Sequence, residues 1–297
     1  MNNLTGRIVK NISNEYEVLS SDNNRFLVKP RGIFRKDSLI PKVGDIVQFN
    51  ETTILKIEKR KNDFIRPFIS NVDYVILVTS AKRPDISFEL LDRFLINIEH
   101  QDTEAIIVVS KCDLLSEIEE KELKNSLSYY SKYYNVFYSR YDGLDDKEGF
   151  YKLLNNKISV VSGQTGAGKS HLLNTLDPNL TLKTDDISIA LGRGKHTTRH
   201  TELLSVSGLL IADTPGFSSL EISEIKSTDL KEYYKEFVEV LNECKYNQCT
   251  HTHEPECKVK ELVKNELILK SRYDSYLKFF AELKELEKTA YKREKKQ

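Results

Sequence analysis

Residues 163–170 read Gly-Gln-Thr-Gly-Ala-Gly-Lys-Ser and match the Gly-x4-Gly-Lys-Ser spacing of a phosphate-binding loop. The apolar run at 158–162 predicts a buried strand before the loop, and residues 171–174 can open a helix after it. The glycines would let backbone N–H groups face phosphate oxygens, while Lys169 reaches the β- and γ-phosphates and the Ser170 hydroxyl binds Mg²⁺. A glycine-rich turn is the alternative, which the predicted strand and helix disfavour. The predicted phosphate-binding residues are Gly163, Gln164, Thr165, Gly166, Ala167, Gly168, Lys169 and Ser170.

A second predicted strand, residues 209–212, leads into Asp213-Thr214-Pro215-Gly216. At the C-terminal end of such a strand, Asp213 would hold Mg²⁺ through water and the Gly216 N–H would face the γ-phosphate. Asp-x-x-Gly by itself most often marks a turn. Its place on the strand after a phosphate-binding loop favours the nucleotide role.

Between these motifs lies a polar, glycine-bearing segment at residues 192–199. It suits a switch that orders only when a γ-phosphate and Mg²⁺ supply contacts. Thr198 is the predicted hydroxyl on Mg²⁺, with Thr197 as the second choice. An ordinary basic surface loop is the alternative for the whole segment.

The strand predicted at residues 105–109 delivers Ser110-Lys111-Cys112-Asp113, which resembles the Asn-Lys-x-Asp guanine motif of GTPases. In that motif the aspartate accepts hydrogen bonds from the base N1–H and N2–H₂, and the lysine stem stacks on the ring. A carboxylate offers only acceptors, so Asp113 suits guanine and leaves adenine unpaired. Ser110 replaces the asparagine, so we expect weaker tethering of the base without loss of guanine specificity. A solvated loop after a strand is the alternative.

A further predicted strand at 136–138 leads to Ser139-Arg140, where GTPases carry a loop whose backbone contacts the guanine O6. The guanine motif and this loop precede the phosphate-binding loop, whereas in ordinary GTPases they follow it. A circular permutation moves the chain ends without changing strand neighbours, so one site can be built from either order. We therefore predict a circularly permuted α/β P-loop GTPase domain over residues 68–222, whose switch beside Asp213 connects directly to the C-terminal module.

That module contains the pattern Cys-x4-Cys-x-His-x5-Cys, which predicts one structural zinc site with four ligands. The predicted ligands are Cys244, Cys249, His251 and Cys257, and His253 is the alternative fourth ligand. Three of the four cysteines of the chain lie here and the fourth, Cys112, lies in the guanine motif, so no disulfide framework is visible. Buried free thiols or a Cys–His nucleophile are the other interpretations.

The N-terminal residues 1–67 have the texture of a small all-β barrel of the OB type, because short β-branched runs alternate with turn signals. They hold 13 Lys/Arg and 8 Asp/Glu, a net charge of +5 in a chain whose total is zero. Such a barrel could bind an RNA backbone. Its aromatic residues either fill the core or stack on bases. These residues are Tyr16, Phe26, Phe34 and Phe49.

Residues 223–297 are predicted to form an α-helical zinc-binding domain. The stretch 262–296 has helical composition without proline or glycine, and Tyr273, Leu277, Phe280 and Leu283 can share one face. Its basic end is either solvated or in contact with RNA. No apolar run is long enough to span a membrane. Free cysteines and the lack of a visible signal region predict a reducing cytoplasm, and we also expect a monomer.

Together these motifs resemble the RsgA (YjeQ/YloQ) family of GTPases, which depend on the small ribosomal subunit. The likeness covers almost the whole chain and also rests on Arg66-Pro67, Asn71-Val72-Asp73 and Asp92-Arg93-Phe94-Leu95. It implies GTP and GDP as substrate and product, Mg²⁺, one structural Zn²⁺, and the small subunit with its rRNA as partner. Hydrolysis stimulated by the subunit would then time release late in subunit maturation.

The resemblance also bears on the hydrolytic water. Ras-like enzymes place a glutamine after Asp-x-x-Gly, whereas Phe217 stands there in this chain and cannot orient water. The family likeness indicates His196 for this role, and a histidine that merely hydrogen-bonds within its loop is the alternative. The predicted catalytic residues are His196, Lys169 and Thr198. We expect slow intrinsic turnover that the small subunit accelerates.

Two other functions are open alternatives. The chain could be an RNA-binding scaffold with a structural, slowly hydrolysed guanine nucleotide. An ATP-dependent hydrolase is a further alternative, which Lys111 and Asp113 disfavour.

Overall fold

The computed structural model of the chain describes residues 3–13, 15–32, 34, 39–65, 68–180, 202–213 and 221–294. They form two compact units. The first unit comprises residues 1–84, 103–115 and 137–218, and the second comprises residues 85–102, 116–136 and 219–297. The predicted domain boundaries at residues 67 and 222 stay predictions. No helix in the described ranges is both long enough and apolar enough to span a membrane.

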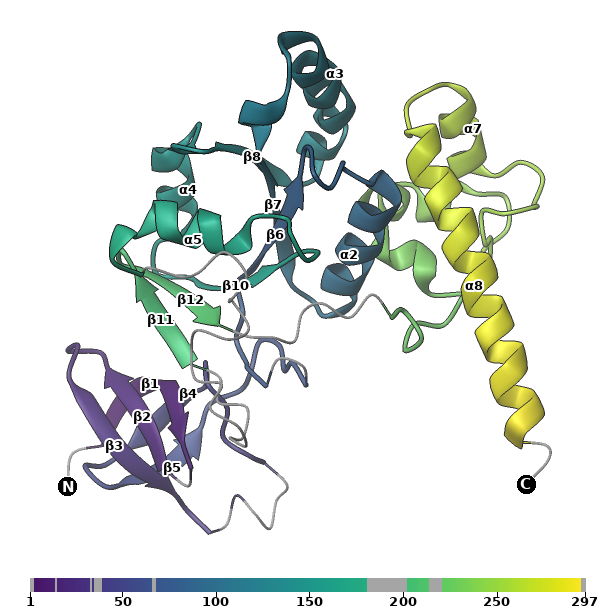
Figure 1. Cartoon of the computed structure of the whole chain (residues 1–297). Coiled ribbons are helices and arrows are strands. Elements are labelled where there is room, and N and C mark those ends of the chain that lie inside the picture. The colour runs from purple at the N-terminus through teal and green to yellow at the C-terminus, as the bar shows by residue number, and fades with distance from the viewer. Residues whose placement is uncertain are drawn as a thin grey trace. The chain divides into compact units, whose positions relative to one another are not determined.

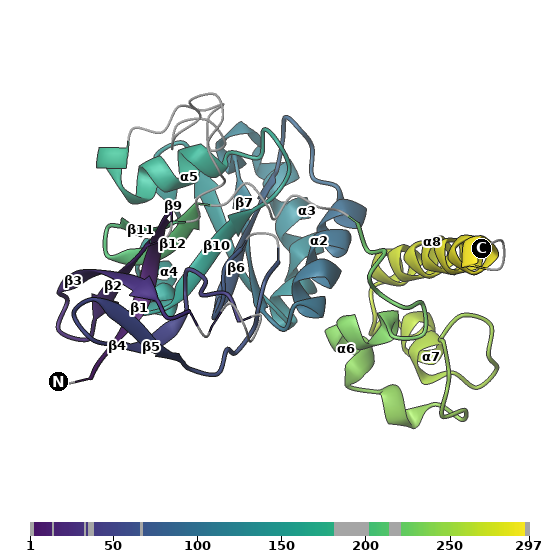
Figure 2. The ribbon, with the colours of Figure 1, turned by 90° about the horizontal axis from the view of Figure 1, so that it is seen from below.

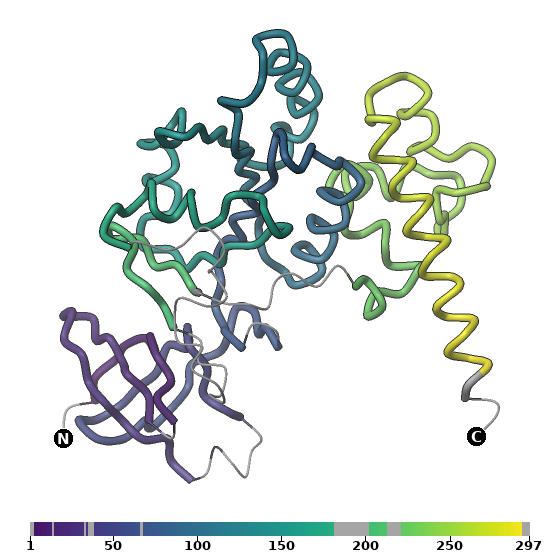
Figure 3. Tube along the Cα trace, viewed as in Figure 1, coloured from purple at the N-terminus to yellow at the C-terminus, as the bar shows by residue number. Residues whose placement is uncertain are grey.

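The N-terminal strands close into a five-stranded barrel, seen in purple in Figures 1 and 3. The strands pair in the order β1-β2-β3-β5-β4, and β1 pairs with both β2 and β4, which closes the circle. The OB-type barrel prediction is confirmed. The strand bounds are β1 Leu4–Ile12, β2 Glu15–Ser20, β3 Arg25–Pro30, β4 Ile46–Phe49 and β5 Thr53–Ile57.

The interior of the barrel explains its aromatic residues. Alternate positions of β2 are buried, as expected for a strand with one face on a core. Tyr16, Phe34 and Phe49 are buried, and the half-buried Phe26 packs edge-on against Phe49 with ring centroids 5.3 Å apart. The core interpretation of these four residues therefore holds.

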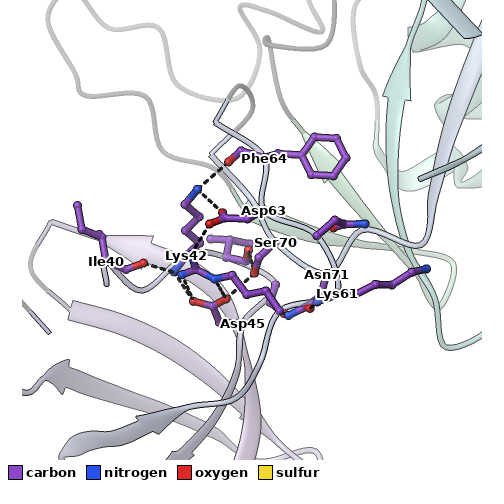
Figure 4. A network of polar contacts seen from close by, with 12 residues as sticks. Ile40, Lys42, Asp45, Lys61, Asp63, Phe64, Ser70 and Asn71 are labelled. Carbon is purple, nitrogen blue, oxygen red and sulfur yellow. Dashed lines mark hydrogen bonds and ion pairs between the residues drawn. The ribbon is translucent and has the colours of Figure 1, made fainter. Parts of the chain in front are cut away.

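A network of charged residues fixes the chain where it leaves the barrel (Figure 4). The buried Asp45 carboxylate accepts hydrogen bonds from Arg60 at 2.7 and 2.8 Å and from the Ser70 hydroxyl at 2.6 Å. The Lys42 ammonium pairs with Asp63 and donates to the Phe64 carbonyl at 2.8 Å. Each buried charge thus has an opposite partner, which is the condition for burying it without a large penalty.

The central sheet continues in the order β11-β12-β10-β6-β7-β8-β9. Strands β12, β10, β6 and β7 are parallel neighbours, so their carboxyl ends meet at one edge. All five residues of β10 are buried, as expected for a central parallel strand. The strand bounds are β6 Tyr74–Ser80, β7 Glu104–Ser110, β8 Asn135–Arg140, β9 Gly143–Leu144, β10 Ile158–Ser162, β11 Glu202–Val206 and β12 Leu209–Asp213.

Two helices of the first unit, α4 (Lys147–Leu154) and α5 (Lys169–Leu176), share a core with the central strands. Phe150 of α4 and Leu172 of α5 are buried in it beside residues of β6, β7 and β10. The Tyr151 hydroxyl donates to the Leu176 carbonyl at 2.8 Å, so the two helices lie side by side. This packing holds the N-terminus of α5 at the carboxyl edge of the sheet.

The second unit is helical, and Figure 2 shows α6 and α7 beside the long α8. Its α-helices are α2 Phe88–His100, α3 Glu117–Ser128, α6 Lys235–Val238, α7 Lys258–Lys264 and α8 Lys270–Glu294. Single 3-10 turns in both units are Cys112–Leu114, Tyr130–Lys132, Pro178–Leu180, Leu230–Tyr233 and Leu241–Glu243. The stretch predicted helical from residue 262 is divided, because Glu266 adopts a left-handed conformation with φ 58°. The predicted face of α8 packs in one apolar cluster with Tyr276 and Phe279.

A buried ion cluster joins three helices of this unit. The Arg272 guanidinium of α8 donates to Asp92 of α2 and to Glu236 of α6, both at 2.7 Å. The three side chains are 2 % exposed or less. The Tyr234 ring lies under the guanidinium at 4.6 Å, which adds a cation–π contact.

Candidate nucleotide-binding site and metal cluster

The phosphate-binding loop lies where its sequence context predicts, between β10 and α5. Strand β10 has β12 on one side and β6 on the other, so the loop emerges at the carboxyl edge of the parallel strands, the usual ligand position of open α/β sheets. Gly163 has φ 130°, and a Cβ there would lie 2.0 Å from the Val78 carbonyl oxygen. Gly166 and Gly168 also adopt positive φ, at 78° and 88°. The loop path therefore requires glycine at these positions.

Lys169 turns back over the loop that precedes it. Its ammonium donates to the carbonyls of Gly163 and Gln164, both at 2.8 Å. Burial lowers the pKa of Lys169 from its ordinary value. The ammonium is thus held at the loop by acceptors that phosphate oxygens could replace, and the neighbouring Ser170 is buried at the start of α5.

The structure brings the guanine motif against the phosphate-binding loop. Ser110, the last residue of β7, is 3 % exposed and donates its hydroxyl hydrogen to the Ala167 carbonyl at 2.5 Å. The Lys111 ammonium donates to the Gly166 carbonyl at 2.7 Å and to the Arg83 carbonyl. Asp113 lies in the turn that follows and is exposed, so its carboxylate is accessible to a base.

The loop after β8 is tied to the same helix. Ser139 is buried and pairs with Leu144 of β9. The Tyr141 carbonyl lies 3.0 Å from Nε2 of His171, and the two rings stack with centroids 5.4 Å apart. The guanine motif and the Ser139 loop are therefore both bonded to the segment 166–171.

Several predicted residues lie outside the described ranges. They are His196, Thr197, Thr198, Gly216 and Phe217. Asp213 is the last residue of β12, and its backbone pairs with Glu202 of β11. Strand β12 borders β10, so Asp213 ends at the edge from which the phosphate-binding loop emerges.

The four predicted zinc ligands form one cluster in the second unit. The ligand atoms of Cys244, Cys249, His251 and Cys257 all lie within 4.8 Å of one another. Nδ1 of His251 lies 3.5 Å from the Cys244 sulfur and 3.4 Å from the Cys257 sulfur. His253 is exposed and bonds Thr252 at 2.9 Å, so the cluster contains His251 instead.

The chemistry of this donor set fits a soft divalent metal. Burial raises the pKa of Cys249 to about 12 and lowers that of His251 to about 4. A neutral imidazole is the form that binds metal, and a bound cation is what converts buried thiols to thiolates. Three sulfurs and one nitrogen form a closed set compatible with a structural zinc site.

Contacts that the sequence did not predict complete both sites. The hydroxyls of Tyr273 and Tyr276 donate to the His251 and Thr250 carbonyls at 2.7 and 2.5 Å, which fixes the metal loop to α8. Their spacing of three on a helix was the available signal, because it places both on one face. Nothing in the sequence marked the Arg83 carbonyl or the Tyr141–His171 pair, since these contacts depend on sheet register.

Comparison with known proteins identifies the family of this chain. The RsgA GTPase family model matches residues 56–223 and the RsgA N-terminal domain model matches residues 5–54. The chain is 43% identical to the small ribosomal subunit biogenesis GTPase RsgA of Lactococcus lactis, over 98% of each chain. It is 46% identical to the protein of that name from Geobacillus kaustophilus, over 94% of this chain and 97% of the relative.

Solved structures agree with these matches. YjeQ from Thermotoga maritima has a TM-score of 0.83 and 36% identity, covering 95% of this chain and 99% of that one. YloQ, described as a circularly permuted GTPase, has a TM-score of 0.83 and 35% identity, covering 96% of each chain. The predicted permuted fold is confirmed, and the chain belongs to the RsgA GTPase family.

Proposed function

We propose that this chain hydrolyses GTP to GDP and phosphate while it acts in late maturation of the small ribosomal subunit. The observation that carries the proposal is the direct bonding of Ser110 and Lys111 to the Ala167 and Gly166 carbonyls. A base-binding motif and a phosphate-binding loop in hydrogen-bond contact make one site for a guanine nucleotide. The relatives are named small ribosomal subunit biogenesis GTPases, which supports the cellular role.

Each part of the site has a separate task in this proposal. The backbone of residues 163–168 holds the phosphates, and the Lys169 ammonium exchanges its carbonyl partners for β- and γ-phosphate oxygens. Asp113 accepts from the base N1–H and N2–H₂, and the backbone after Ser139 meets O6. The hydroxyls of Ser170 and Thr198, with Asp213 through water, supply the oxygen ligands that Mg²⁺ prefers. Mg²⁺ bound there would neutralise charge on the phosphates.

In this proposal His196 activates the attacking water. Phe217 stands where a glutamine would orient the water, and its ring has no polar atom. His196 accepts or relays a hydrogen bond from the attacking water, and Gly216 faces the γ-phosphate. Replacing His196 with alanine should lower the hydrolysis rate while it spares nucleotide affinity, because the role concerns only the transition state. Wild-type hydrolysis by His196→Ala on small subunits would eliminate this role.

The parts outside the nucleotide site bind the partner. The barrel region, residues 1–67, carries a net charge of +5 and contacts phosphates of the rRNA in the small subunit. The cluster at Cys244, Cys249, His251 and Cys257 would hold one structural Zn²⁺. Residues 68–222 form the GTPase domain and residues 223–297 the zinc-binding domain of a monomer that works in the cytoplasm. GTP hydrolysis then sets the time of release from the subunit.

The rate of GTP hydrolysis with different partners tests this function. Purified small subunits should raise the single-turnover rate at least about tenfold, because a partner that orders a switch completes the site. Large subunits and free RNA, at equal concentration, should leave the rate within about twofold of the basal value. A Ser170→Ala protein serves as the inactive control. Negligible hydrolysis with small subunits, together with tight GTP and subunit binding, would instead identify a scaffold.

A further inference from the structure

The hydroxyl of Ser110 is already committed to the protein. A serine hydroxyl has a single hydrogen to donate. The Ser110 oxygen lies 2.5 Å from the Ala167 carbonyl and 3.3 Å from the Thr79 carbonyl, and both of these groups are acceptors. This hydrogen is therefore donated within the protein, from the end of β7 to the phosphate-binding loop or to β6.

The packing around this hydroxyl keeps it directed at the loop. Ser110 is 3 % exposed. A Cβ at Gly168 would lie 3.3 Å from its oxygen, so the side chain fits against the glycine that precedes α5. The hydroxyl thus joins the end of β7 to the phosphate-binding loop across 57 residues of sequence.

Guanine presents two acceptors, N7 and O6, on the edge opposite its sugar-edge donor. Reading N7 requires an N–H or O–H donor from the protein. Two other side-chain donors near the loop already have acceptors in the protein. Nε2 of His171 donates to the Tyr141 carbonyl, and the Lys111 ammonium uses two of its three N–H groups on the Gly166 and Arg83 carbonyls. Asparagine at position 110 would differ from serine, because its amide has two N–H donors and could serve the loop and the base together.

We propose that Ser110 makes this nucleotide site indifferent to the N7 acceptor, so that a guanine nucleotide with C–H in place of N7 binds as tightly as the unmodified one. The base is selected through its N1–H and N2–H₂ by Asp113, while Ser110 positions the phosphate-binding loop. This inference rests on the proposed guanine-nucleotide function. It makes residue 110 a specificity determinant within that site.

Competition binding with GDP and 7-deaza-GDP tests the proposal, because 7-deaza-GDP carries C–H in place of N7. The full-length protein should bind the two nucleotides with affinities within about twofold of each other. A protein that reads N7 would bind 7-deaza-GDP about three- to tenfold more weakly, the effect of one hydrogen bond. Such discrimination by the wild type would overturn the proposal, whereas failure to bind either nucleotide would overturn the proposed function instead.

Variants at position 110 separate specificity from positioning. Ser110→Asn should gain a preference for GDP over 7-deaza-GDP of about three- to tenfold. Ser110→Ala should lower the affinities for both nucleotides equally, because it removes only the bond to Ala167. Ser110→Thr keeps a hydroxyl and should bind both nucleotides with wild-type affinity. A folded Ser110→Asn protein that binds both nucleotides equally would contradict the assignment. If that variant does not fold, the ratio of the wild-type affinities for GDP and 7-deaza-GDP tests the proposal by itself.

Discussion

The nucleotide site and the metal cluster are assembled in opposite ways. The nucleotide site joins Ser110 to Ala167 and Lys111 to Gly166, pairs that lie 57 and 55 residues apart in sequence. Parallel strands bring these residues to one edge of the sheet. The metal cluster takes all four ligands from residues 244–257, a single stretch of the second unit.

The two sites also differ in exposure. His251 is 0 % exposed and Cys249 is 2 % exposed, whereas Asp113 is exposed and Lys111 is half-buried. A permanent ligand can be enclosed by its protein, but a ligand that is exchanged in each cycle must be able to leave. The difference fits the proposed roles, in which the enclosed cluster would hold a structural ion and the more open site would exchange its nucleotide.

The largest expected effect is the loss of metal from the second unit. Its core contains Cys249 and Cys257 among apolar residues, so an ion bound by these thiols would help to hold that core together. Cys249→Ser should destabilise the second unit by at least about 5 kcal/mol. Hydrogen exchange of residues 221–294 measures this effect. GDP affinity should change little, because every described hydrogen bond between the nucleotide motifs lies within the first unit.

His253→Ala is the matched control for the metal prediction, because this residue is exposed and outside the cluster. It should leave hydrogen exchange and zinc content unchanged. A Cys249→Ser protein with wild-type exchange in residues 221–294 would show that the cluster contributes nothing to folding.

The next effect concerns the buried ion cluster of the same unit. Arg272→Met leaves Asp92 and Glu236 buried without their cation, which should cost about 3–5 kcal/mol in the free energy of unfolding. Urea denaturation measures the change. Lys270→Met is the control at the start of the same helix, since its pair with Asp274 is solvent-exposed and is worth about 0.5 kcal/mol or less. Equal losses in the two variants would refute the role of burial.

Lys169→Ala tests the nucleotide site of this comparison. Removing the ammonium that we propose contacts the transferred phosphate should lower kcat/KM for GTP by about 100-fold or more, with the fold intact. Single-turnover hydrolysis on small subunits gives the rate, and circular dichroism checks the fold. Lys157→Ala, an exposed lysine before β10, should keep the wild-type rate. A similar loss in both variants would mean that lysine charge acts only at long range.

The smallest effect is expected at Ser110. Ser110→Ala removes one neutral hydrogen bond between the guanine motif and the loop, so GDP affinity should fall by about 1 kcal/mol. Isothermal titration calorimetry resolves such a change. An unchanged affinity would show that the Ala167 contact does not position the site.

Local geometry was predictable from the sequence and long-range contacts were not. The glycine spacing at 163–168, the Cys/His spacing and the turn signals of the barrel each depend on neighbouring residues. The bond from Ser110 to Ala167 depends on the register of β6, β7 and β10, which composition does not encode. The left-handed Glu266 that divides α7 from α8, and the burial of Arg272 in a charged helix, depend on tertiary packing.

Affinity for the small ribosomal subunit in different nucleotide states tests the central claim most directly. The wild-type protein should bind purified small subunits at least about tenfold more tightly with a non-hydrolysable GTP analogue than with GDP, a typical size for coupling between two sites. Sedimentation with the subunits gives both affinities. Equal affinities in the two states would contradict the account, because hydrolysis could then not time release.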